Sequence, residues 1–436
     1  MTHRLSNTPS GPSDNINRRA FVKASAAATI ASLASSPLWA RSGVHAGVRD
    51  SVRVGVIGCG GRGTGAAADA LAAGENVQVH ALADVFEHRL RGCRGELEKR
   101  GTRGMVRDDM CFTGFDAYKQ LLQTDVDMVI LATPPHFRPM HFEAAVNAGK
   151  HVFMEKPCAV DGPGVRRVLA SAAVVDEKGL SVVAGTQRRH EASYLALIEQ
   201  IRSGVIGEVV SARCWWNQGG LWVVEKTPQM SGMEWQVRNW LYFTWLSGDH
   251  IVEQHVHNLD VCNWVIGDHP VKCMGMGGRQ VRTEAKYGNI FDHFAVEYEY
   301  PSGVVVASQC RQIDGCAGRV AEAFHGTKGR TLSSPGQAQV HGATSWRFPG
   351  RQRSPYEQEH VDLVASITGQ SARLNEARNV AHSTLTAIMG RMSAYTGKEV
   401  TWEQALDSQE DLSPPSYEWM DIPVPPVAVP GQTPLR

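Results

Sequence analysis

The sequence has no excess of charge of either sign. Its 436 residues include 44 lysine and arginine residues and 44 aspartate and glutamate residues. This balance gives no electrostatic reason to expect a nucleic acid or an anionic membrane as partner. The nine cysteines are scattered, odd in number and without paired metal-ligand spacing, so no disulfide framework is expected. The length is too great for one ordinary core and predicts two domains.

Residues 1–40 have the features of an export signal. Arg18 and Arg19 precede a hydrophobic residue, a lysine and an alanine-rich, weakly apolar run from Ala24 to Ala34. A twin arginine before such a run is typical of the route that exports folded proteins. The run is short for a membrane span, and no cysteine follows it closely, so no membrane or lipid anchor is expected after signal removal. The alternative is a disordered basic N-terminus; export would place the protein in the periplasm or another extracytoplasmic compartment.

A glycine-rich turn between a strand and a helix indicates a dinucleotide-binding fold. Residues 51–57 are rich in β-branched side chains and predict a buried strand, and residues 64–73 predict an alanine-rich helix. Glycines between them permit a tight turn, a close approach of backbone to a pyrophosphate, and close packing of the helix on the strand. An ordinary strand-to-helix turn is the alternative. The turn reads Gly58-Cys59-Gly60-Gly61-Arg62-Gly63.

The second predicted strand ends in an acidic residue, Asp84. A carboxylate there can accept hydrogen bonds from an adenosine ribose, and it repels a 2′-phosphate. NAD is therefore favoured over NADP. The neighbouring His88, Arg89 and Arg91 keep NADP possible, because an arginine can hold the extra phosphate.

Two further predicted strands, 126–132 and 151–154, end in polar residues. Ligands of open parallel sheets bind at the carboxyl ends of strands, so Lys156 would present its amine beside a bound nicotinamide. A buried lysine near a cation has its charged form disfavoured, which suits proton transfer near neutral pH. A surface lysine at a strand end is the alternative. The two strands run into Thr133-Pro134-Pro135-His136 and Glu155-Lys156-Pro157.

With the stretches 148–157 and 185–189, these motifs resemble the glucose–fructose oxidoreductase and inositol dehydrogenase family (Gfo/Idh/MocA). The likeness runs from about Val52 to Trp402. It implies an α/β protein with an N-terminal Rossmann domain, a doubly wound parallel sheet, and a C-terminal α+β domain with an open, mostly antiparallel sheet that often forms oligomer contacts. A homo-oligomer is therefore expected. The predicted cofactor-binding residues are Gly58, Gly60, Gly61, Arg62, Gly63, Asp84, Thr133, Pro134, His136, Glu155, Lys156 and Gln187.

The domain limits follow from the distribution of these patterns. Alternating strands at 209–216, 294–300 and 304–311, with a Pro-Ser-Gly turn between the last two, support an antiparallel sheet. Helices are predicted at 356–368 and 375–396. We predict a signal at 1–40, a Rossmann domain at 50–175 completed by 180–205, and a substrate and oligomerisation domain at 206–410. A proline-rich and loosely ordered tail is predicted at 411–436.

A cluster of histidines and carboxylates supplies the remaining catalytic candidates. A helix is predicted from residue 248 to Trp264, with Glu253 and His257 four apart on one face. The family pattern Asp-x-Gly-x-His-x-x-Asp aligns here, so the resemblance makes Lys156 the catalytic and substrate-binding lysine and His257 the catalytic histidine. Glu253 replaces the first acidic position and His255 replaces glycine. A metal held by these histidines is an alternative, but histidines two apart face differently and no metal is expected.

We expect hydride transfer between a tightly held nicotinamide cofactor and a hydroxyl or ketone of a sugar, polyol or glycoside. Lys156, His257 and Glu253 are the predicted catalytic residues. One alternative is a glycosidase or lyase that uses bound NAD transiently, by oxidation, elimination and re-reduction; another is a binding protein without redox activity. The sugar and the carbon oxidised stay open. Candidate substrate contacts are Arg188, His255, Trp235 and Trp240.

Overall fold

The computed structural model describes residues 51–436, and the predicted export signal lies outside the described residues. Their first half contains a six-stranded parallel sheet in the order β3-β2-β1-β4-β5-β6. The strand order reverses between β1 and β4, the position where dinucleotides bind in such sheets. The predicted Rossmann domain is confirmed. The strands are β1 (Val52–Ile57), β2 (Val77–Asp84), β3 (Cys111–Thr113), β4 (Met128–Leu131), β5 (His151–Met154) and β6 (Val182–Ala184).

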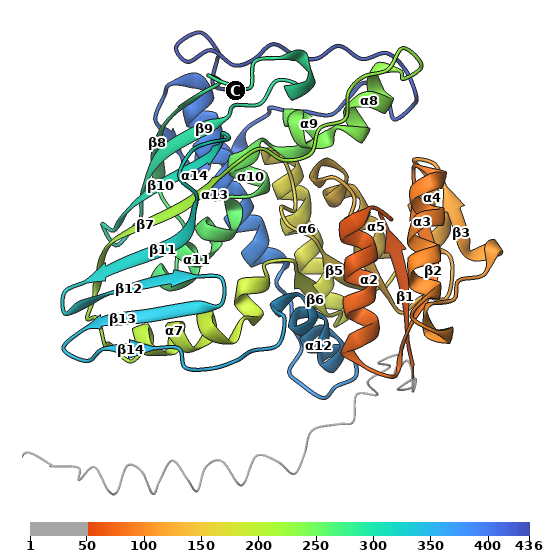
Figure 1. The fold of residues 1–436 in the computed structure, drawn as a ribbon, viewed down its shortest axis with the longest axis horizontal. Coiled ribbons are helices and arrows are strands. Elements are labelled where there is room, and N and C mark those ends of the chain that lie inside the picture. The colour runs from red at the N-terminus through yellow and green to blue at the C-terminus, as the bar shows by residue number, and fades with distance from the viewer. Residues whose placement is uncertain (1–50) are drawn as a thin grey trace, which may run out of the picture. The chain divides into compact units, whose positions relative to one another are not determined.

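Helices cover both faces of this sheet, because its strands carry apolar side chains on both sides (Figure 1). One face packs against α2 (Gly61–Ala73), α3 (Glu87–Glu98) and α12 (Pro355–Ile367). The other face packs against α4 (Ala117–Leu122), α5 (Arg138–Asn147) and α6 (Gly162–Lys178). Helix α12 follows the second sheet in sequence, yet it packs on the Rossmann half.

The second half is built on a nine-stranded sheet in the order β14-β13-β12-β11-β7-β10-β9-β8-β15. Strands β7 and β10 pair in parallel and all other pairs are antiparallel, so the mostly antiparallel sheet is confirmed. Its strands are β7 (Val209–Gln218), β8 (Lys272–Gly278), β9 (His293–Glu299), β10 (Val305–Gln312), β11 (Arg319–Gly326), β12 (Gly329–Ser334), β13 (Gln337–Gly342), β14 (Trp346–Arg347) and β15 (Val400–Thr401).

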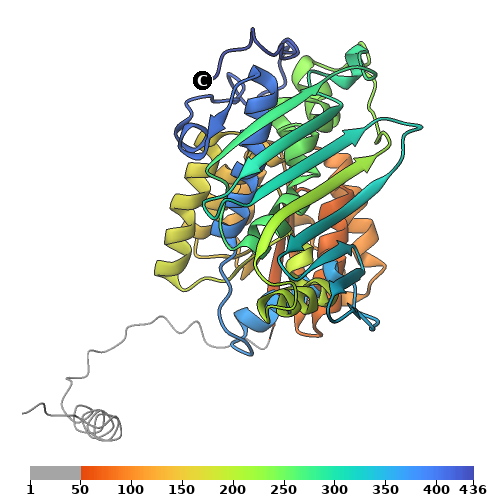
Figure 2. The ribbon, with the colours of Figure 1, turned by 90° about the vertical axis from the view of Figure 1, so that its left-hand side faces the viewer.

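Helices α11 (Val256–Ile266) and α13 (Ala377–Thr396) pack on one face of this sheet, and Figure 2 looks onto the other face. The predicted turn between β9 and β10 is present, with the Tyr300 N–H donating to Val304 O at 2.9 Å. Gly303 allows it, because its φ of 80° lies in the left-handed region.

The remaining elements are short. The α-helices are α7 (Ala192–Arg202), α8 (Gly232–Arg238), α9 (Thr244–Ser247), α10 (His250–Glu253) and α14 (Trp402–Asp407). The 3₁₀ turns are η1 (Thr102–Gly104), η2 (Asp108–Met110), η3 (Pro135–Phe137), η4 (Gln187–His190), η5 (Trp240–Tyr242) and η6 (Ala285–Tyr287). No helix within residues 51–436 is long and apolar enough to cross a membrane.

Two local expectations need correction. The helix predicted from residue 248 to Trp264 is divided into α10 and α11, with Gln254 and His255 between them. The tail, expected to be loosely ordered, has no helix or strand after α14, but it makes specific contacts with both halves. Tyr417 and Trp419, for example, pack against aromatic side chains of the Rossmann half.

Candidate functional site

A cleft of about 740 Å³ lies along the carboxyl edge of the parallel sheet, over the glycine turn. Gly58 has a φ of 99°, and a Cβ there would lie 2.6 Å from the backbone of Ala132 and Thr133. At Gly63 a Cβ would lie 1.8 Å from the carbonyl oxygen of Gly58. Both positions therefore require glycine, as the sequence predicted. Gly61 has no atom within 4 Å of an added Cβ, so the backbone that lines the cleft is open to a ligand.

Asp84 joins the end of β2 to the glycine turn. Its Oδ2 accepts a hydrogen bond from the Cys59 N–H at 2.6 Å, and its Oδ1 accepts one from the Phe86 N–H at 2.7 Å. Burial raises the pKa of this carboxyl above its ordinary value, and the two N–H bonds oppose that rise. Asp84 lines the cleft together with Arg89, so both the predicted acidic residue and its basic neighbour are next to the cleft.

The other walls of the cleft come from both halves of the chain. The end of β4 contributes Thr133 and Pro134, both predicted cofactor residues. Trp222 and Trp240 approach from the segment 219–245 of the second half. A volume of about 740 Å³ lies within the roughly 300–1,000 Å³ range of cofactor sites. The glycine turn, the first amides of α2 and the Asp84 carboxylate match the diphosphate and ribose of a dinucleotide.

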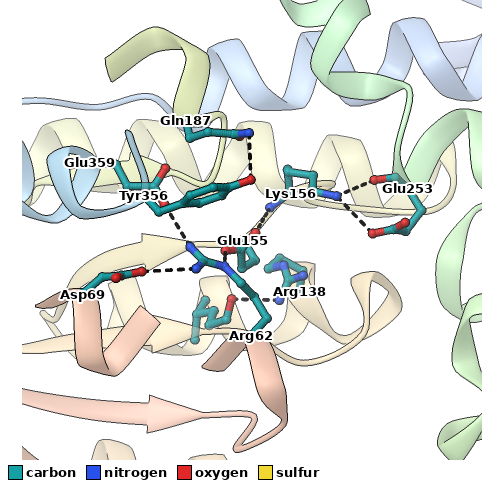
Figure 3. A network of polar contacts seen from close by, with 10 residues as sticks. Arg62, Asp69, Arg138, Glu155, Lys156, Gln187, Glu253, Tyr356 and Glu359 are labelled. Atoms are coloured by element: carbon teal, nitrogen blue, oxygen red, sulfur yellow. Dashed lines mark hydrogen bonds and ion pairs between the residues drawn. The ribbon is translucent and has the colours of Figure 1, made fainter. Parts of the chain in front are cut away.

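Arg62 connects the glycine turn to β5 and to α12 (Figure 3). Its guanidinium forms ion pairs with Glu155 and, at 2.9 Å, with Glu359. The ring of Tyr356 lies 5.2 Å from this guanidinium, and the Gln187 amide donates to the Tyr356 hydroxyl at 3.3 Å. The predicted cofactor residues Arg62, Glu155 and Gln187 therefore belong to one network.

Lys156 points from the end of β5 toward α10 (Figure 3). Its Nζ donates to the Glu253 backbone oxygen at 2.6 Å and pairs with Glu253 Oε1 at 3.0 Å. Only 11% of the Lys156 side chain is exposed, and the Lys156–Pro157 peptide bond is cis. The Lys156 N–H also donates to Glu155 Oε2 at 3.2 Å. The structure thus brings together two predicted catalytic residues, beside the arginine that lines the cleft.

His257 lies in the first turn of α11 and stacks on Trp216, with ring centroids 5.5 Å apart. Burial, with the nearby positive charges of Lys156 and Arg188, holds the pKa of His257 well below its ordinary value. The imidazole is therefore neutral at neutral pH, as a proton acceptor must be. Its buried Nδ1 has no hydrogen-bond partner among the described residues.

Three of the predicted substrate contacts are buried in the structure. Arg188 is 1% exposed and forms an ion pair with the fully buried Glu322. His255 is fully buried and its Nε2 lies 2.6 Å from Ser308 Oγ. Trp235 is 7% exposed and its indole N–H donates to a backbone oxygen of the segment 219–245. All three side chains are buried, but Arg188 Nε and His255 Nδ1 have no hydrogen-bond partner among the described residues, so their role as substrate contacts stays a prediction.

Two other candidates have unexpected surroundings. Trp240 lines the cleft, and its role as a substrate contact stays a prediction. His136 is buried behind the cleft wall, where its Nε2 lies 2.9 Å from the Tyr417 hydroxyl.

Asp260, three residues after His257, pairs with Arg189 at 2.9 Å. Within residues 51–436 no group of three or more His, Cys, Asp or Glu side chains is arranged to hold a metal ion.

Sequence reasoning missed the contribution of α12. Tyr356 and Glu359 reach the glycine turn from a helix that follows the second sheet. No spacing in the sequence indicates this return, since Glu359 lies 297 residues from Arg62. The buried face of α12 carries Glu359, His360 and Ser366 beside Leu363 and Val364, so the sequence pattern did not single out Glu359.

A glycine turn on a parallel sheet, an acidic residue at the end of β2 and a lysine at the end of β5 define a dinucleotide-dependent oxidoreductase. The chain belongs to the Gfo/Idh/MocA family. Residues 52–185 match the model of the oxidoreductase family with an NAD-binding Rossmann fold, and residues 194–332 match the GFO/IDH/MocA C-terminal domain.

Relatives differ in how much of their length is matched. The myo-inositol 2-dehydrogenase of Thermotoga maritima is 25% identical over 284 residues, which are 65% of this chain and 75% of that protein. A glycosyl hydrolase family 109 protein of Shewanella baltica is 28% identical over 236 residues, half of each chain. The match to an inositol 2-dehydrogenase of Rhizobium meliloti is 24% identical over 207 residues, which are 47% of this chain and 56% of that relative.

Solved structures share the fold. The aldose-aldose oxidoreductase of Caulobacter crescentus superposes with a TM-score of 0.63 at 18% identity, covering 80% of this chain and 99% of that one. A levoglucosan dehydrogenase in complex with NADH and levoglucosan superposes with a TM-score of 0.62 at 16% identity, with the same coverage. The two-domain α/β architecture is therefore common to this chain and to both enzymes.

Proposed function

We propose that this oxidoreductase moves a hydride between bound NAD and a hydroxyl-bearing carbon of a sugar, polyol or glycoside. The observation that carries the proposal is the contact of Lys156 with Glu253, next to Glu155, whose ion-pair partner Arg62 lines the cleft. An ammonium group held there can donate a hydrogen bond to a substrate oxygen. The dehydrogenase names among the relatives support this substrate class.

The residues around Lys156 have complementary roles. The neutral imidazole of His257 can take the proton of a substrate hydroxyl. The ammonium of Lys156 stabilises the negative charge that develops on the same oxygen, and Glu253 fixes the direction of that ammonium. A bound nicotinamide would supply the hydride acceptor.

The test is turnover of a panel of sugars, polyols and aryl glycosides, read by nicotinamide absorbance and product mass. With an active substrate in hand, Glu253→Gln should lower kcat by about 10- to 100-fold, because the neutral amide orients the ammonium less strongly. Glu177→Gln, an exposed change on helix α6, is the matched control. The proposal is wrong if no hydroxyl compound gives a change in absorbance or mass, or if Glu253→Gln acts like its control.

A second candidate is redox-assisted cleavage, in which oxidation, elimination and re-reduction leave the cofactor unchanged. It is favoured by the relatives named glycosyl hydrolase family 109 protein and 2,7-anhydro-N-acetylneuraminate hydratase. Oxidation of one hydroxyl acidifies the neighbouring C–H, so the same lysine and histidine serve both reactions. Turnover of an aryl glycoside without net change in NADH would identify this route, and accumulation of NADH would exclude it for that substrate.

We also propose export by the twin-arginine route, supported by Arg18, Arg19 and the apolar run that follows them. Because free nicotinamide nucleotide is scarce outside the cytoplasm, the exported enzyme has to carry its cofactor with it. Cell fractionation of the parent and of a twin-lysine variant, Arg18→Lys with Arg19→Lys, tests the route. We expect the variant to stay in the cytoplasm while the parent is exported. The same distribution for the variant and the parent would refute the assignment.

Self-association through the outer face of the large sheet is a further proposal. Met274, Met276 and Val305 are exposed on that face by 48%, 73% and 38%, and Figure 2 shows the strands that carry them. Met274 and Met276 lie on β8 and Val305 lies on β10, with β9 between them. Exposed apolar side chains on one sheet face favour a symmetric contact. Light scattering of Met276→Glu against the parent tests it: a smaller species is expected for the variant, and an unchanged mass would contradict the interface.

A further inference from the structure

Residues 411–423, here called the tail segment, contact both walls of the nucleotide cleft. We propose that this segment retains the nucleotide by holding the two walls together, with Tyr417 and Trp419 as positioning residues. The inference depends on the proposed function, because it assumes that a dinucleotide occupies the cleft. In Figure 1 the chain after α14 runs beside α8, in the darkest blue.

The first set of contacts holds the wall formed by the Rossmann half. The ring of Trp419 lies 5.3 Å from Phe86, to which it is stacked, and 4.8 Å from Phe115. Both phenylalanines line the cleft, the first beside Asp84. The ring of Tyr417 lies 5.7 Å from that of Phe137, which also lines the cleft. The tail segment therefore supports three aromatic side chains of this wall from behind.

The Tyr417 hydroxyl adds a polar contact to the same wall, at 2.9 Å from His136 Nε2. His136 follows Thr133 and Pro134, which line the cleft. Burial lowers the pKa of His136 to about 4, so a neutral imidazole meets the hydroxyl at neutral pH. This bond joins the tail segment to the turn after β4.

The second set of contacts holds the wall formed by the second half. The Gly232 N–H donates to Asp421 Oδ1 at 2.7 Å, and the Met233 N–H donates to the Met420 backbone oxygen at 2.9 Å. Both residues open helix α8, whose Val237 lines the cleft. An added Cβ at Gly232 would lie 2.7 Å from the backbone of Ile422, which shows how closely the two segments approach.

These two sets of contacts occur within a few residues of each other. Trp419 binds the wall that carries Asp84, and Asp421 binds the wall that carries Val237. The inference is that a nucleotide leaves when the walls separate, because separation breaks either the aromatic contacts or the hydrogen bonds to α8. The tail segment thus slows release without touching the reacting atoms.

The experiment measures release of nucleotide from the full chain. Protein loaded with NADH is mixed with excess NAD, and the loss of bound NADH fluorescence gives the dissociation rate. Trp419→Ala should raise this rate by at least 10-fold, with kcat of the protein loaded with nucleotide within about twofold of the parent. Trp419→Phe, which keeps an aromatic ring, should restore slow release. Glu418→Gln, an exposed neighbour in the same segment, is the matched control.

A second pair of variants tests the other wall and protects against a folding defect at Trp419. Asp421→Ala removes the acceptor for the Gly232 N–H and should also speed release, whereas Asp421→Asn keeps an acceptor oxygen and should not. Release as slow as in the parent for both Trp419→Ala and Asp421→Ala would overturn the inference. A parent protein that binds no nicotinamide nucleotide at all would instead overturn the proposed function, so the two failures are distinguishable.

Discussion

Replacement of Gly63 by alanine adds a single methyl group at the most crowded point of the glycine turn. Its Cβ would lie 1.8 Å from the carbonyl oxygen of Gly58 and 3.2 Å from the Ala132 Cβ. Ordinary contact begins at 3.4 Å, so the helix or the turn has to move by about 1.6 Å, the difference of the two distances. The obstacle is backbone on one side, and a change of rotamer cannot relieve it.

The expected cost is about 1–3 kcal/mol of unfolding free energy, as for other overpacked sites. The helix propensity of alanine offsets only about 0.5–1 kcal/mol of this. Movement of α2 also displaces the amides that face the diphosphate, so the dissociation constant for NAD should rise at least 10-fold, about 1.4 kcal/mol. Urea unfolding and calorimetric titration with NAD measure the two quantities.

Gly65→Ala is the matched control, two residues further along the same helix. The only atom near its added Cβ is a guanidinium nitrogen of Arg62, at 3.9 Å. This variant should be as stable as the parent or more stable by about 0.5–1 kcal/mol, with NAD affinity within twofold. If Gly63→Ala unfolded and bound NAD like Gly65→Ala, the close packing of α2 on the turn could not be what shapes the diphosphate site.

Three further predictions concern the site and its supports. Lys156→Met should lower kcat by about 10²–10⁴-fold while NAD affinity changes less than 10-fold, since the amine acts on the substrate. If NAD affinity fell by as large a factor as kcat, that role would be contradicted. Arg188→Met should cost about 3–5 kcal/mol of unfolding free energy, because Glu322 is left as an unpaired buried charge, and the double variant with Glu322→Leu should recover most of it in urea titrations. Burial lowers the pKa of His141 to about 3, so the unfolded state takes up its proton first as the pH falls below about 6.5. Stability is therefore lost on acidification, by about 2 kcal/mol at pH 5 for this group, and His141→Gln should lose correspondingly less between pH 7 and pH 5.

Local signals predicted the parts of the fold that depend on neighbouring residues. The strand at 151–154 was predicted with its observed bounds, and the helix at 375–396 ends at Thr396, before Gly397, as expected. Gly58 and Gly63 were predictable because a tight turn between strand and helix requires residues without a Cβ at these two positions. Lys156 lies two residues after the end of its strand, so its position at the sheet edge required no knowledge of the rest of the chain.

Long-range pairing could not be predicted in the same way. Arg188 follows a Gly-Thr-Gln motif, and nothing local indicates that Glu322 on a distant strand neutralises it. Trp235 and Trp240 have similar sequence surroundings, yet one is enclosed by core residues and the other lines the cleft. The division between α10 and α11 likewise depends on where His255 packs, since its ring is bound to Ser308 on β10.

The contacts of the tail segment with both halves have a kinetic consequence. If the tail segment retains the coenzyme as proposed, the bound coenzyme has to be oxidised and reduced in place, so an electron donor and an electron acceptor must react at the Lys156 site one after the other. Double-reciprocal plots for such a pair of substrates are parallel lines. Loosening the tail segment would make free dinucleotide an ordinary co-substrate, and plots for NAD and the electron donor would then be intersecting lines.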